Sequence, residues 1–204
     1  MEEFSTTAII DNGNRHSWGQ ASQDYARFRD IYPGSLFEKL HALDIGRQGQ
    51  TIIDLGTGTG AIPRYLAKFG ATFFGMDISK EQIDQARQLS TGLNLAIRWS
   101  VAPAEKTGLP DAFADVVMAC QCFTYFDKSQ AIPEIKRILR PNGRFAKVSM
   151  IWLPYEDSIA EKTEEIILKY NPNWTGAGFT GCHSKFLIGQ ETILPLILSI
   201  HTMH

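Results

Sequence analysis

The sequence predicts an α/β fold in which helices cover both faces of a doubly wound, mostly parallel sheet. Two observations lead to this prediction. From about residue 51 to residue 170, short apolar runs alternate with segments of helical spacing, as in sheets whose parallel strands are joined by crossover helices. The runs are apolar at nearly every position, which is typical of strands that are buried on both faces.

An N-terminal helical cap is expected ahead of the sheet. The apolar residues of 22–43 follow a helical spacing that Pro33-Gly34 interrupts, because proline ends or bends a helix. Ser35 follows this break, where its hydroxyl can cap the second piece. We therefore assign the helical cap to residues 21–45, and the polar residues 1–20 to a mobile N-terminal arm.

Five strands are expected in the sheet. Each is a short apolar run next to a turn signal, such as the glycine-rich segment after Leu55 or the Pro141-Asn142-Gly143 turn before the last strand. The expected strands are residues 51–55, 72–77, 95–101, 115–119 and 144–151.

Four helices are expected to accompany the strands. Ser79 precedes one of them, and Gln82 stands three residues later, as in a capping box. Pro133, near the start of another, bends or marks its first turn. The helices are expected at residues 61–69, 80–89, 128–139 and 158–170. In the first and last helices an apolar stripe is expected to face inward, formed by Ile62, Tyr65, Leu66 and Phe69, and by Ile159, Ile166, Ile167 and Tyr170.

The composition argues against several classes of protein. A length of 204 residues suits one domain, and a formal net charge of −2 does not suit the broad basic surface that nucleic acid requires. No apolar run approaches the roughly 20 residues of a membrane span, and the N-terminus lacks the features of a signal peptide. We expect a cytoplasmic protein with neither nucleic acid nor membrane as a partner.

The cysteines predict buried thiols and no metal site. Cys120, Cys122 and Cys182 are odd in number and irregular in spacing, which does not suit a disulfide framework. Cys120 and Cys122 would share a face if both lay on a strand. Free cysteine is usually a small buried apolar residue.

The segment from Asp54 to Gly60 carries the strongest functional signal. Its sequence, Asp-Leu-Gly-Thr-Gly-Thr-Gly, follows an apolar strand and opens a helix, so its glycines let the backbone turn tightly and approach a ligand. The start of the helix also offers free N–H groups to a polar ligand. A tight turn without a ligand is the alternative interpretation.

Two carboxylates sharpen this hypothesis. Asp77 ends the second strand about 20 residues after the loop, where an acidic side chain can bind the two hydroxyls of a ribose. Asp54 precedes the first glycine, where a carboxylate would face a cationic group such as an ammonium or a sulfonium. Each has a structural alternative, since Asp77 could cap the following helix and Asp54 could hold the backbone of the loop.

These motifs resemble those of the class I S-adenosylmethionine-dependent methyltransferases, in the same order along roughly residues 20–179. The resemblance implies a Rossmann-like sheet with strand order 3-2-1-4-5, S-adenosyl-L-methionine as the cofactor, and a domain over residues 21–179. The similar segments are 53–60, 74–79, 102–117, 139–145 and, for the cap of the small-molecule branch that includes trans-aconitate-type enzymes, 25–33.

The resemblance also implies roles for individual residues. The loop glycines would pass beneath the methionine and ribose of the cofactor, Asp77 would bind the ribose hydroxyls, and Ile78 would pack on the adenine. Pro103 stands where family members often carry an acid, so adenine recognition would rest on Glu105 and backbone groups. The implied cofactor-binding residues are Asp54, Gly56, Thr57, Gly58, Gly60, Asp77, Ile78, Ala104, Glu105, Cys120, Gln121, Tyr25 and Arg29, with Tyr32 as a further residue that would close over the cofactor.

The predicted activity is transfer of a methyl group to a small-molecule acceptor by in-line displacement. In such a reaction the protein mainly positions the reactants and excludes water, and no catalytic residue is assigned. One alternative is a domain that binds S-adenosylmethionine without turnover. Another is an NAD-dependent oxidoreductase. Two features argue against it, namely Asp54 before the glycines and the lack of a Tyr-x-x-x-Lys pair in the sequence.

Residues 180–204 depart from the family pattern and are assigned to an atypical C-terminal tail. Family members continue with a helix and two strands that complete the order with a 7-6 hairpin, whereas this tail has no hairpin signal and Pro195 interrupts its most apolar run. The strand at 144–151 would then be an exposed edge, which invites pairing. Either the tail folds back to cover this edge or a second copy covers it, giving a homodimer.

Overall fold

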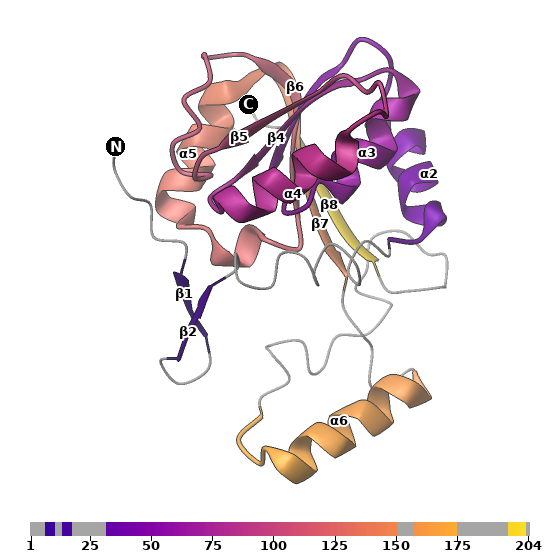
Figure 1. Ribbon diagram of the computed structural model, residues 1–204, viewed down its shortest axis with the longest axis vertical. Helices are drawn as coiled ribbons and strands as arrows, with labels where there is room; N and C mark the ends of the chain where they lie inside the picture. The colour runs from indigo at the N-terminus through magenta and orange to yellow at the C-terminus, as the bar shows by residue number, and fades with distance from the viewer. Residues whose placement is uncertain (1–6, 11–13, 18–31, 151–156, 175–195, 203–204) are drawn as a thin grey trace. The chain divides into compact units, whose positions relative to one another are not determined.

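Figure 1 shows the computed structural model of the chain, which describes residues 7–10, 14–17, 32–150, 157–174 and 196–202. The chain divides into two compact units. One comprises residues 1–146 with 200–204, and the other comprises residues 147–199.

A six-stranded sheet has the order β5-β4-β3-β6-β7-β8. β3 pairs in parallel with β4 and with β6, and β4 pairs in parallel with β5. The first five strands have the predicted order 3-2-1-4-5, so the doubly wound α/β fold is confirmed. The strands are β3 (Thr51–Leu55), β4 (Thr72–Asp77), β5 (Ile97–Val101), β6 (Ala114–Cys120), β7 (Leu139–Met150) and β8 (Leu196–Thr202).

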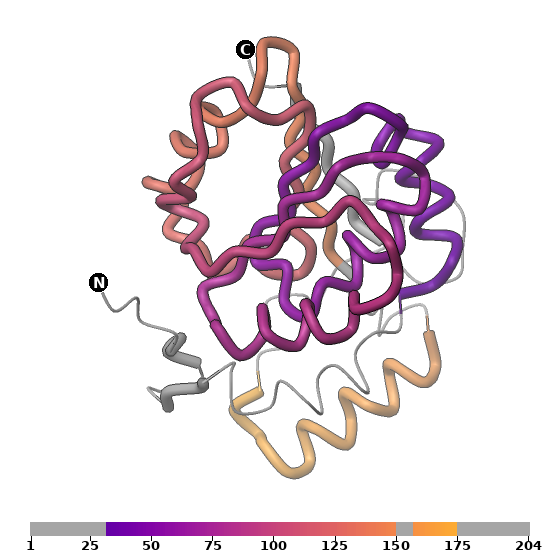
Figure 2. The backbone as a smooth tube through the Cα atoms, turned by 45° about the horizontal axis from the view of Figure 1, so that its top comes forward, coloured from indigo at the N-terminus to yellow at the C-terminus, as the bar shows by residue number. Residues whose placement is uncertain are grey.

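Helices lie on both sides of the sheet in the first unit. In the ribbon and tube views α2 and α3 lie on one side and α5 on the other (Figures 1 and 2). This arrangement follows from the strand order, because the chain reverses its direction across the sheet between β5 and β6. The helices are α2 (Gly34–Ala42), α3 (Ala61–Leu66), α4 (Lys80–Ser90) and α5 (Lys128–Ile138), with short 3-10 turns η1 (Ala67–Phe69) and η2 (Phe123–Tyr125).

The core of the first unit lies on both faces of β3 and β6, as their continuous apolar runs predict. Ile52 and Ile53 are neighbours on one strand and point to opposite faces, yet both have no exposed surface. Val116 and Val117 are equally buried on the adjacent strand. Burial of each such side chain contributes about 1.5–3 kcal/mol, so the central strands are firmly held and their ends form a rigid edge.

The helix after β3 is shorter than predicted, and its apolar stripe is only partly buried. Tyr65 and Phe69, which were predicted to face inward, are 37% and 44% exposed. The helix gives way to the narrower turn η1, which moves the last side chains away from the α-helical stripe. The two rings instead stack on Phe37 and His41 of α2.

Only one of the two predicted serine caps is present. Ser35 does not cap α2, because the helix begins one residue earlier and Pro33 occupies its N-cap position in an extended conformation without a side-chain hydrogen bond. Ser79 does cap α4, since its Oγ accepts a hydrogen bond from the Gln82 N–H at 3.3 Å. The Ser79 hydroxyl donates to the Glu81 carboxylate at 2.8 Å. The first piece of the predicted cap, up to residue 31, lies outside the described residues.

β7 begins at Leu139 rather than at the predicted Arg144. The reason is that the backbone becomes extended directly after α5, with a ψ of 137° at Leu139. The predicted turn falls inside this element, and Asn142 has the positive φ of 64° that such a turn requires. The remaining helices and strands of residues 51–138 lie within two residues of their predicted bounds.

The tail contains a strand that the sequence did not predict. β8 follows β7 in the sheet order, which agrees with the alternative that the tail covers the edge beside β7. Pro195 stands immediately before this strand in the sequence, a position where the missing N–H of proline does little harm. The strand begins only after the proline that interrupts the apolar run.

Residues 1–20, which were assigned to a mobile N-terminal arm, contain two strands that the sequence did not predict. β1 (Thr7–Ile10) and β2 (Asn14–Ser17) form a two-stranded antiparallel sheet. The sequence between them includes Asn12-Gly13, a pair that favours tight hairpin turns.

The second unit contains α6 (Ser158–Tyr170), whose bounds agree with the prediction. Of its predicted apolar stripe, Ile159, Ile166 and Tyr170 are 76%, 59% and 79% exposed, and Ile167 is half-buried. Glu164 is buried instead, and the Trp174 Nε1–H donates to its Oε2 at 2.7 Å. Periodicity indicates that a helix has an apolar face, but what covers the face depends on tertiary packing.

Candidate functional site

The carboxyl ends of β3, β4 and β6 meet at one edge of the sheet. The register pairs Leu55 with both Met76 and Ala119, so the chain leaves the three strands at nearly the same level. In open parallel sheets this edge is where ligands bind. The predicted site residues that it brings together are Asp54, Asp77 and Cys120.

The glycine-rich loop between β3 and α3 is bound to the neighbouring strand. Gly56, Gly58 and Gly60 have φ values of 63°, 57° and 78°, a region in which other residues are strained. The Thr57 N–H donates to a carbonyl oxygen of β4 at 2.9 Å, and the Gly58 N–H donates to Asp77 Oδ2 at 2.8 Å. These bonds fix the loop against β4.

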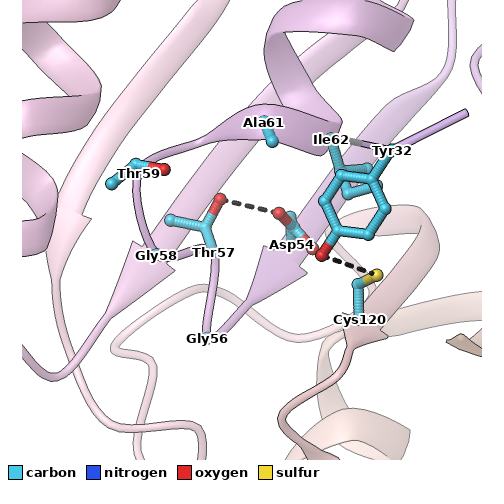
Figure 3. Close-up of a pocket in the computed structure, with 9 residues that line it drawn as sticks. All are labelled: Tyr32, Asp54, Gly56, Thr57, Gly58, Thr59, Ala61, Ile62 and Cys120. Carbon is cyan, nitrogen blue, oxygen red and sulfur yellow. Dashed lines mark hydrogen bonds between the residues drawn. The ribbon is translucent and has the colours of Figure 1, made fainter. Parts of the chain in front are cut away.

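Asp54 is buried beside this loop, and one of its carboxylate oxygens has no partner. The residue is 1% exposed. Its Oδ2 accepts a hydrogen bond from Thr57 Oγ1 at 2.6 Å, whereas its buried Oδ1 has no hydrogen-bond partner in the described part of the chain. Burial raises the pKa of Asp54 from 3.8 to about 7, against the Thr57 hydrogen bond and with a smaller contribution from Asp77. Figure 3 shows its carboxylate in a pocket that Tyr32 and Cys120 also line.

Asp77 binds backbone on two sides. Its Oδ2 accepts from Gly58 in the loop at 2.8 Å, and its Oδ1 accepts from the Ser79 N–H at the start of α4 at 2.9 Å. Burial raises its pKa, while these two hydrogen bonds lower it. Because a carboxylate has about four lone-pair sites and this side chain is only half-buried, its oxygens retain acceptor capacity for a ligand.

Trp99 of β5 fills the space beside two glycines, a feature that sequence reasoning missed. A Cβ on Gly60 would lie 2.3 Å from its Cη2, and a Cβ on Gly75 would lie 2.2 Å from its Cζ3. The glycine at position 60 is thus required by packing, and it is not among the residues that line the pocket. Gly75, inside a strand, was the available signal, since such glycines often mark a close approach.

Of the two cysteines near the loop, Cys120 is buried and Cys122 is half-buried, and they do not share a strand face. Cys120 is the last residue of β6, and Cys122 lies beyond it, where its thiol donates to the Leu55 carbonyl oxygen at 3.1 Å. A Cβ on Gly56 would lie 2.7 Å from Cys122 Sγ. Burial raises the pKa of Cys120 to about 12 and that of Cys122 well above 9.0. Both thiols are therefore protonated at neutral pH.

The end of β6 meets the described end of the cap at the pocket. The Cys120 thiol donates to the Tyr32 hydroxyl oxygen at 3.5 Å, as Figure 3 shows. The next residue, Gln121, has a φ of 61°, which is uncommon for a residue other than glycine. Such strain gathers at functional sites. Tyr25 and Arg29, also predicted to contact the cofactor, lie outside the described residues.

Besides Gly60, the predicted residues Asp77, Ile78, Ala104, Glu105 and Gln121 do not line the pocket. Ile78 is half-buried in the turn between β4 and α4, and Ala104 is 7% exposed within the apolar core. Glu105 is half-buried, and its Oε1 accepts from the Asp127 N–H at 2.8 Å, which ties the loop after β5 to the start of α5. The place of Ile78, Ala104 and Glu105 at the adenine end stays a prediction.

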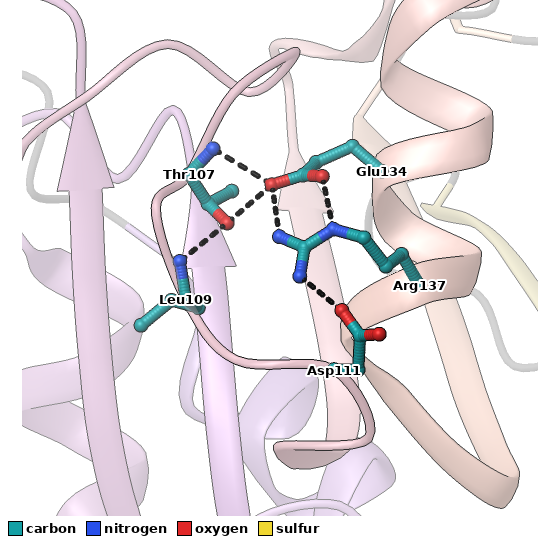
Figure 4. A network of polar contacts seen from close by, with 5 residues as sticks. All are labelled: Thr107, Leu109, Asp111, Glu134 and Arg137. Atoms are coloured by element: carbon teal, nitrogen blue, oxygen red, sulfur yellow. Dashed lines mark hydrogen bonds and ion pairs between the residues drawn. The ribbon is translucent and has the colours of Figure 1, made fainter.

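A network of polar contacts braces the loop between β5 and β6 (Figure 4). Glu134 Oε1 accepts from the N–H and the Oγ1 of Thr107 at 2.8 and 2.6 Å. Arg137 donates from Nε to Glu134 Oε2 at 2.8 Å and from Nη1 to Asp111 Oδ1 at 2.6 Å. The Arg137 hydrogen bond is the main reason why the pKa of Glu134 falls to about 2. No sequence motif had indicated this network.

Comparisons with known proteins agree with this geometry. Residues 53–146 match the model of a methyltransferase domain family. The chain is 31% identical to an uncharacterised methyltransferase of Mycobacterium bovis over 139 residues, which make up 67% of this chain and 51% of that protein. It is 28% identical to the ubiquinone biosynthesis O-methyltransferase of Pseudomonas fluorescens over 134 residues, 63% of this chain and 56% of that protein. The chain belongs to this methyltransferase domain family.

The fold of this methyltransferase has solved counterparts. The crystal structure of a proposed S-adenosyl-L-methionine-dependent methyltransferase from Methanococcus maripaludis is similar with a TM-score of 0.63, covering 87% of this chain and 83% of that chain at 20% sequence identity. That likeness concerns the fold. The chain spans about half of the length of the curated relatives that it matches.

The residues of the methyltransferase pocket fit a cofactor with a cationic amino-acid end. A buried carboxylate oxygen without a partner, such as Asp54 Oδ1, is costly unless a donor or a positive charge reaches it. The pocket beside it is lined by Tyr32, Asp54, Gly56, Thr57, Gly58, Thr59, Ala61, Ile62 and Cys120. The sequence analysis did not name Thr59, Ala61 or Ile62 as site residues.

Two further findings concern the described residues alone. They contain no cluster of histidine, cysteine and acidic side chains that could hold a metal ion. No helix among them combines the length and the apolar character that crossing a membrane requires.

Proposed function

We propose that this methyltransferase binds S-adenosyl-L-methionine and transfers its methyl group to a small-molecule acceptor. One observation carries the proposal. The buried Asp54 Oδ1 lies at the pocket and has no hydrogen-bond partner among the residues that the structure describes. A carboxylate in that state suits the ammonium group of an amino acid, because hydrogen bonds between charged groups are the strong ones.

The loop geometry also argues against a dinucleotide. A dinucleotide places its pyrophosphate on free N–H groups at the start of the helix. Here the N–H groups of Thr57 and Gly58 already donate to β4. The two carboxylates Asp54 and Asp77 would also repel a pyrophosphate. An NAD-dependent oxidoreductase therefore fits the site less well.

The site residues divide by their position around the pocket. Asp54 would hold the methionine ammonium, and the half-buried Asp77 would accept hydrogen bonds from the ribose hydroxyls. Tyr32 and Cys120, which line the pocket together with Asp54, would exclude water from it. The remaining assignments, to Gly56, Thr57, Gly58, Gly60, Ile78, Ala104, Glu105, Gln121, Tyr25 and Arg29, stay predictions.

When bound, S-adenosylmethionine supplies a methyl group on a sulfonium, an electrophile that needs no covalent help from the protein. The chain's own residues then have to orient the acceptor in line and keep water out. No residue is assigned as a general base. The Cys120 thiol, with a pKa of about 12, stays protonated near neutral pH and is a poor nucleophile.

A small-molecule acceptor is supported by charge and by kinship. The chain has a formal net charge of −2, which does not favour nucleic acid. A relative at 28% identity is, by its name, an O-methyltransferase of ubiquinone biosynthesis. Cytoplasmic location and a homodimer stay predictions, and light scattering after gel filtration would test the second.

Calorimetric titration tests the proposed cofactor. S-adenosylhomocysteine and S-adenosylmethionine should bind, and NAD should give no heat. Binding of NAD without a response to S-adenosylhomocysteine would contradict the proposal. A panel of phenols, carboxylic acids and amines with radiolabelled cofactor then separates methyl transfer from the alternative, binding without turnover.

A further inference from the structure

The surroundings of Asp54 contain acidic and neutral groups but no compensating cation in the described part of the chain. Asp77 of β4 is a nearby group of like charge, which raises the pKa of Asp54. The charge of Asp54 in turn raises the pKa of the Cys120 and Cys122 thiols at and just after the end of β6. Tyr32 lines the same pocket. An ionised Asp54 would thus be a desolvated anion whose partner is a single hydroxyl, that of Thr57.

A carboxyl group in this position has two ways to avoid an unpaired charge. Without a ligand it can keep its proton, and burial raises its pKa to about 7 in that state. With a ligand cation beside Oδ1, it can ionise and form a charge-assisted hydrogen bond. The pocket lining that Asp54 shares with the loop makes it accessible to such a ligand.

We propose that Asp54 exchanges its proton for the ammonium group of the cofactor, so that cofactor uptake releases a proton to solvent and becomes weaker as the pH falls. The proposal rests on the proposed function, since it requires a ligand with an amino-acid end. The carboxyl O–H bond of Asp54 breaks, the proton leaves to buffer, and the ligand ammonium keeps its own protons. Asp54 is then the residue by which the pocket selects cationic over neutral adenosine compounds.

The test is titration calorimetry with two ligands that share adenosine and a thioether. S-adenosylhomocysteine carries the ammonium group, and methylthioadenosine does not. Each is titrated at pH 6 and pH 8 in two buffers of different protonation enthalpy, phosphate and imidazole, so that the difference in heat counts the protons released.

With a pKa of about 7 for Asp54, S-adenosylhomocysteine should release about 0.9 proton at pH 6 and about 0.1 at pH 8. Its Kd should be about ten-fold higher at pH 6 than at pH 8 by the same linkage. Methylthioadenosine should bind without release at either pH. Failure of S-adenosylhomocysteine to bind at all would defeat the proposed function. Binding of it that is independent of buffer and pH would defeat the exchange while leaving the proposed function standing.

Two variants assign the proton to Asp54. Asp54→Asn should bind S-adenosylhomocysteine more weakly and release no proton, and release that persists in this variant would point to Asp77 and overturn the assignment. Thr57→Val removes the hydroxyl that stabilises the Asp54 anion, so it should move the midpoint of proton release to higher pH. An unchanged or lowered midpoint in a folded Thr57→Val variant would overturn the proposal even if Asp54→Asn fails to fold.

Discussion

Asp54 and Glu134 are carboxylates of the same unit that hold loops in place, yet their surroundings are opposite. Glu134 accepts hydrogen bonds from Thr107 and Arg137 on both of its oxygens, and its pKa falls to about 2. Among the described residues Asp54 has one hydroxyl partner, on Oδ2, and none on Oδ1, and its pKa rises to about 7. Both oxygens of Glu134 thus have partners, whereas one oxygen of Asp54 has none in the described part of the chain.

The largest expected effect is in the stability of the ligand-free protein as a function of pH. The folded pKa of Asp54 is raised, so the native state holds a proton that the unfolded state has lost, and the free energy of unfolding should fall as the pH rises from about 4 to about 7. The whole shift corresponds to about 4 kcal/mol. Asp54→Asn should flatten this slope and be more stable than the parent at pH 8. Urea unfolding at pH 5 and pH 8 measures this pH dependence. If the free energy of unfolding changes equally with pH in both proteins, Asp54 is not its cause.

A substitution of Asp77 tests whether this carboxylate binds a ligand or only holds the loop. Asp77→Ala should weaken S-adenosylhomocysteine binding by about 2–4 kcal/mol, because two charge-assisted hydrogen bonds to a partly buried ribose contribute roughly that much. Calorimetry on the folded variant measures the change. An unaltered Kd would mean that Asp77 only joins the loop to α4 through Gly58 and Ser79.

Gly60 separates packing from ligand binding within the loop. Gly60→Ala should destabilise the fold by about 2–3 kcal/mol, from a positive φ and from contact with the Trp99 ring at 2.3 Å. Gly92→Ala is a matched control, since Gly92 has a φ of 79° and nothing within 4 Å of an added Cβ. Equal losses in thermal or urea unfolding would show that backbone strain alone makes Gly60 necessary.

The smallest expected effect concerns the brace. Glu134→Ala should lower the free energy of unfolding by about 2 kcal/mol at pH 7, because it leaves the buried Thr107 N–H and hydroxyl without their acceptor. The lowered pKa means that Glu134 contributes this stability above its unfolded value and loses it as the pH falls from about 4.5 towards about 2. Glu38→Ala, at an exposed position of α2, is the control for urea unfolding. The affinity for S-adenosylhomocysteine should persist in Glu134→Ala. A loss of affinity as large as that of Asp77→Ala would show that the brace and the pocket are energetically coupled.

The sequence by itself determined the order of the elements and the loop at the heart of the site. Apolar runs and helical spacing are local patterns, and parallel strands necessarily bring their carboxyl ends to one edge. The conjunction of Asp54, the three loop glycines and Asp77 could therefore be predicted before any contact was known.

The tertiary structure decided which side chains are satisfied and which are not. Trp99 against Gly60, Tyr32 beside Cys120, and Thr107 on Glu134 join positions 27 to 88 residues apart, and no local pattern specifies such pairs. The exposed stripe of α6 has the same cause, since spacing marks an apolar face without naming its cover. The unpartnered oxygen of Asp54 likewise emerges only when every neighbour is in place, because burial and hydrogen bonding are properties of the packed chain rather than of the residue.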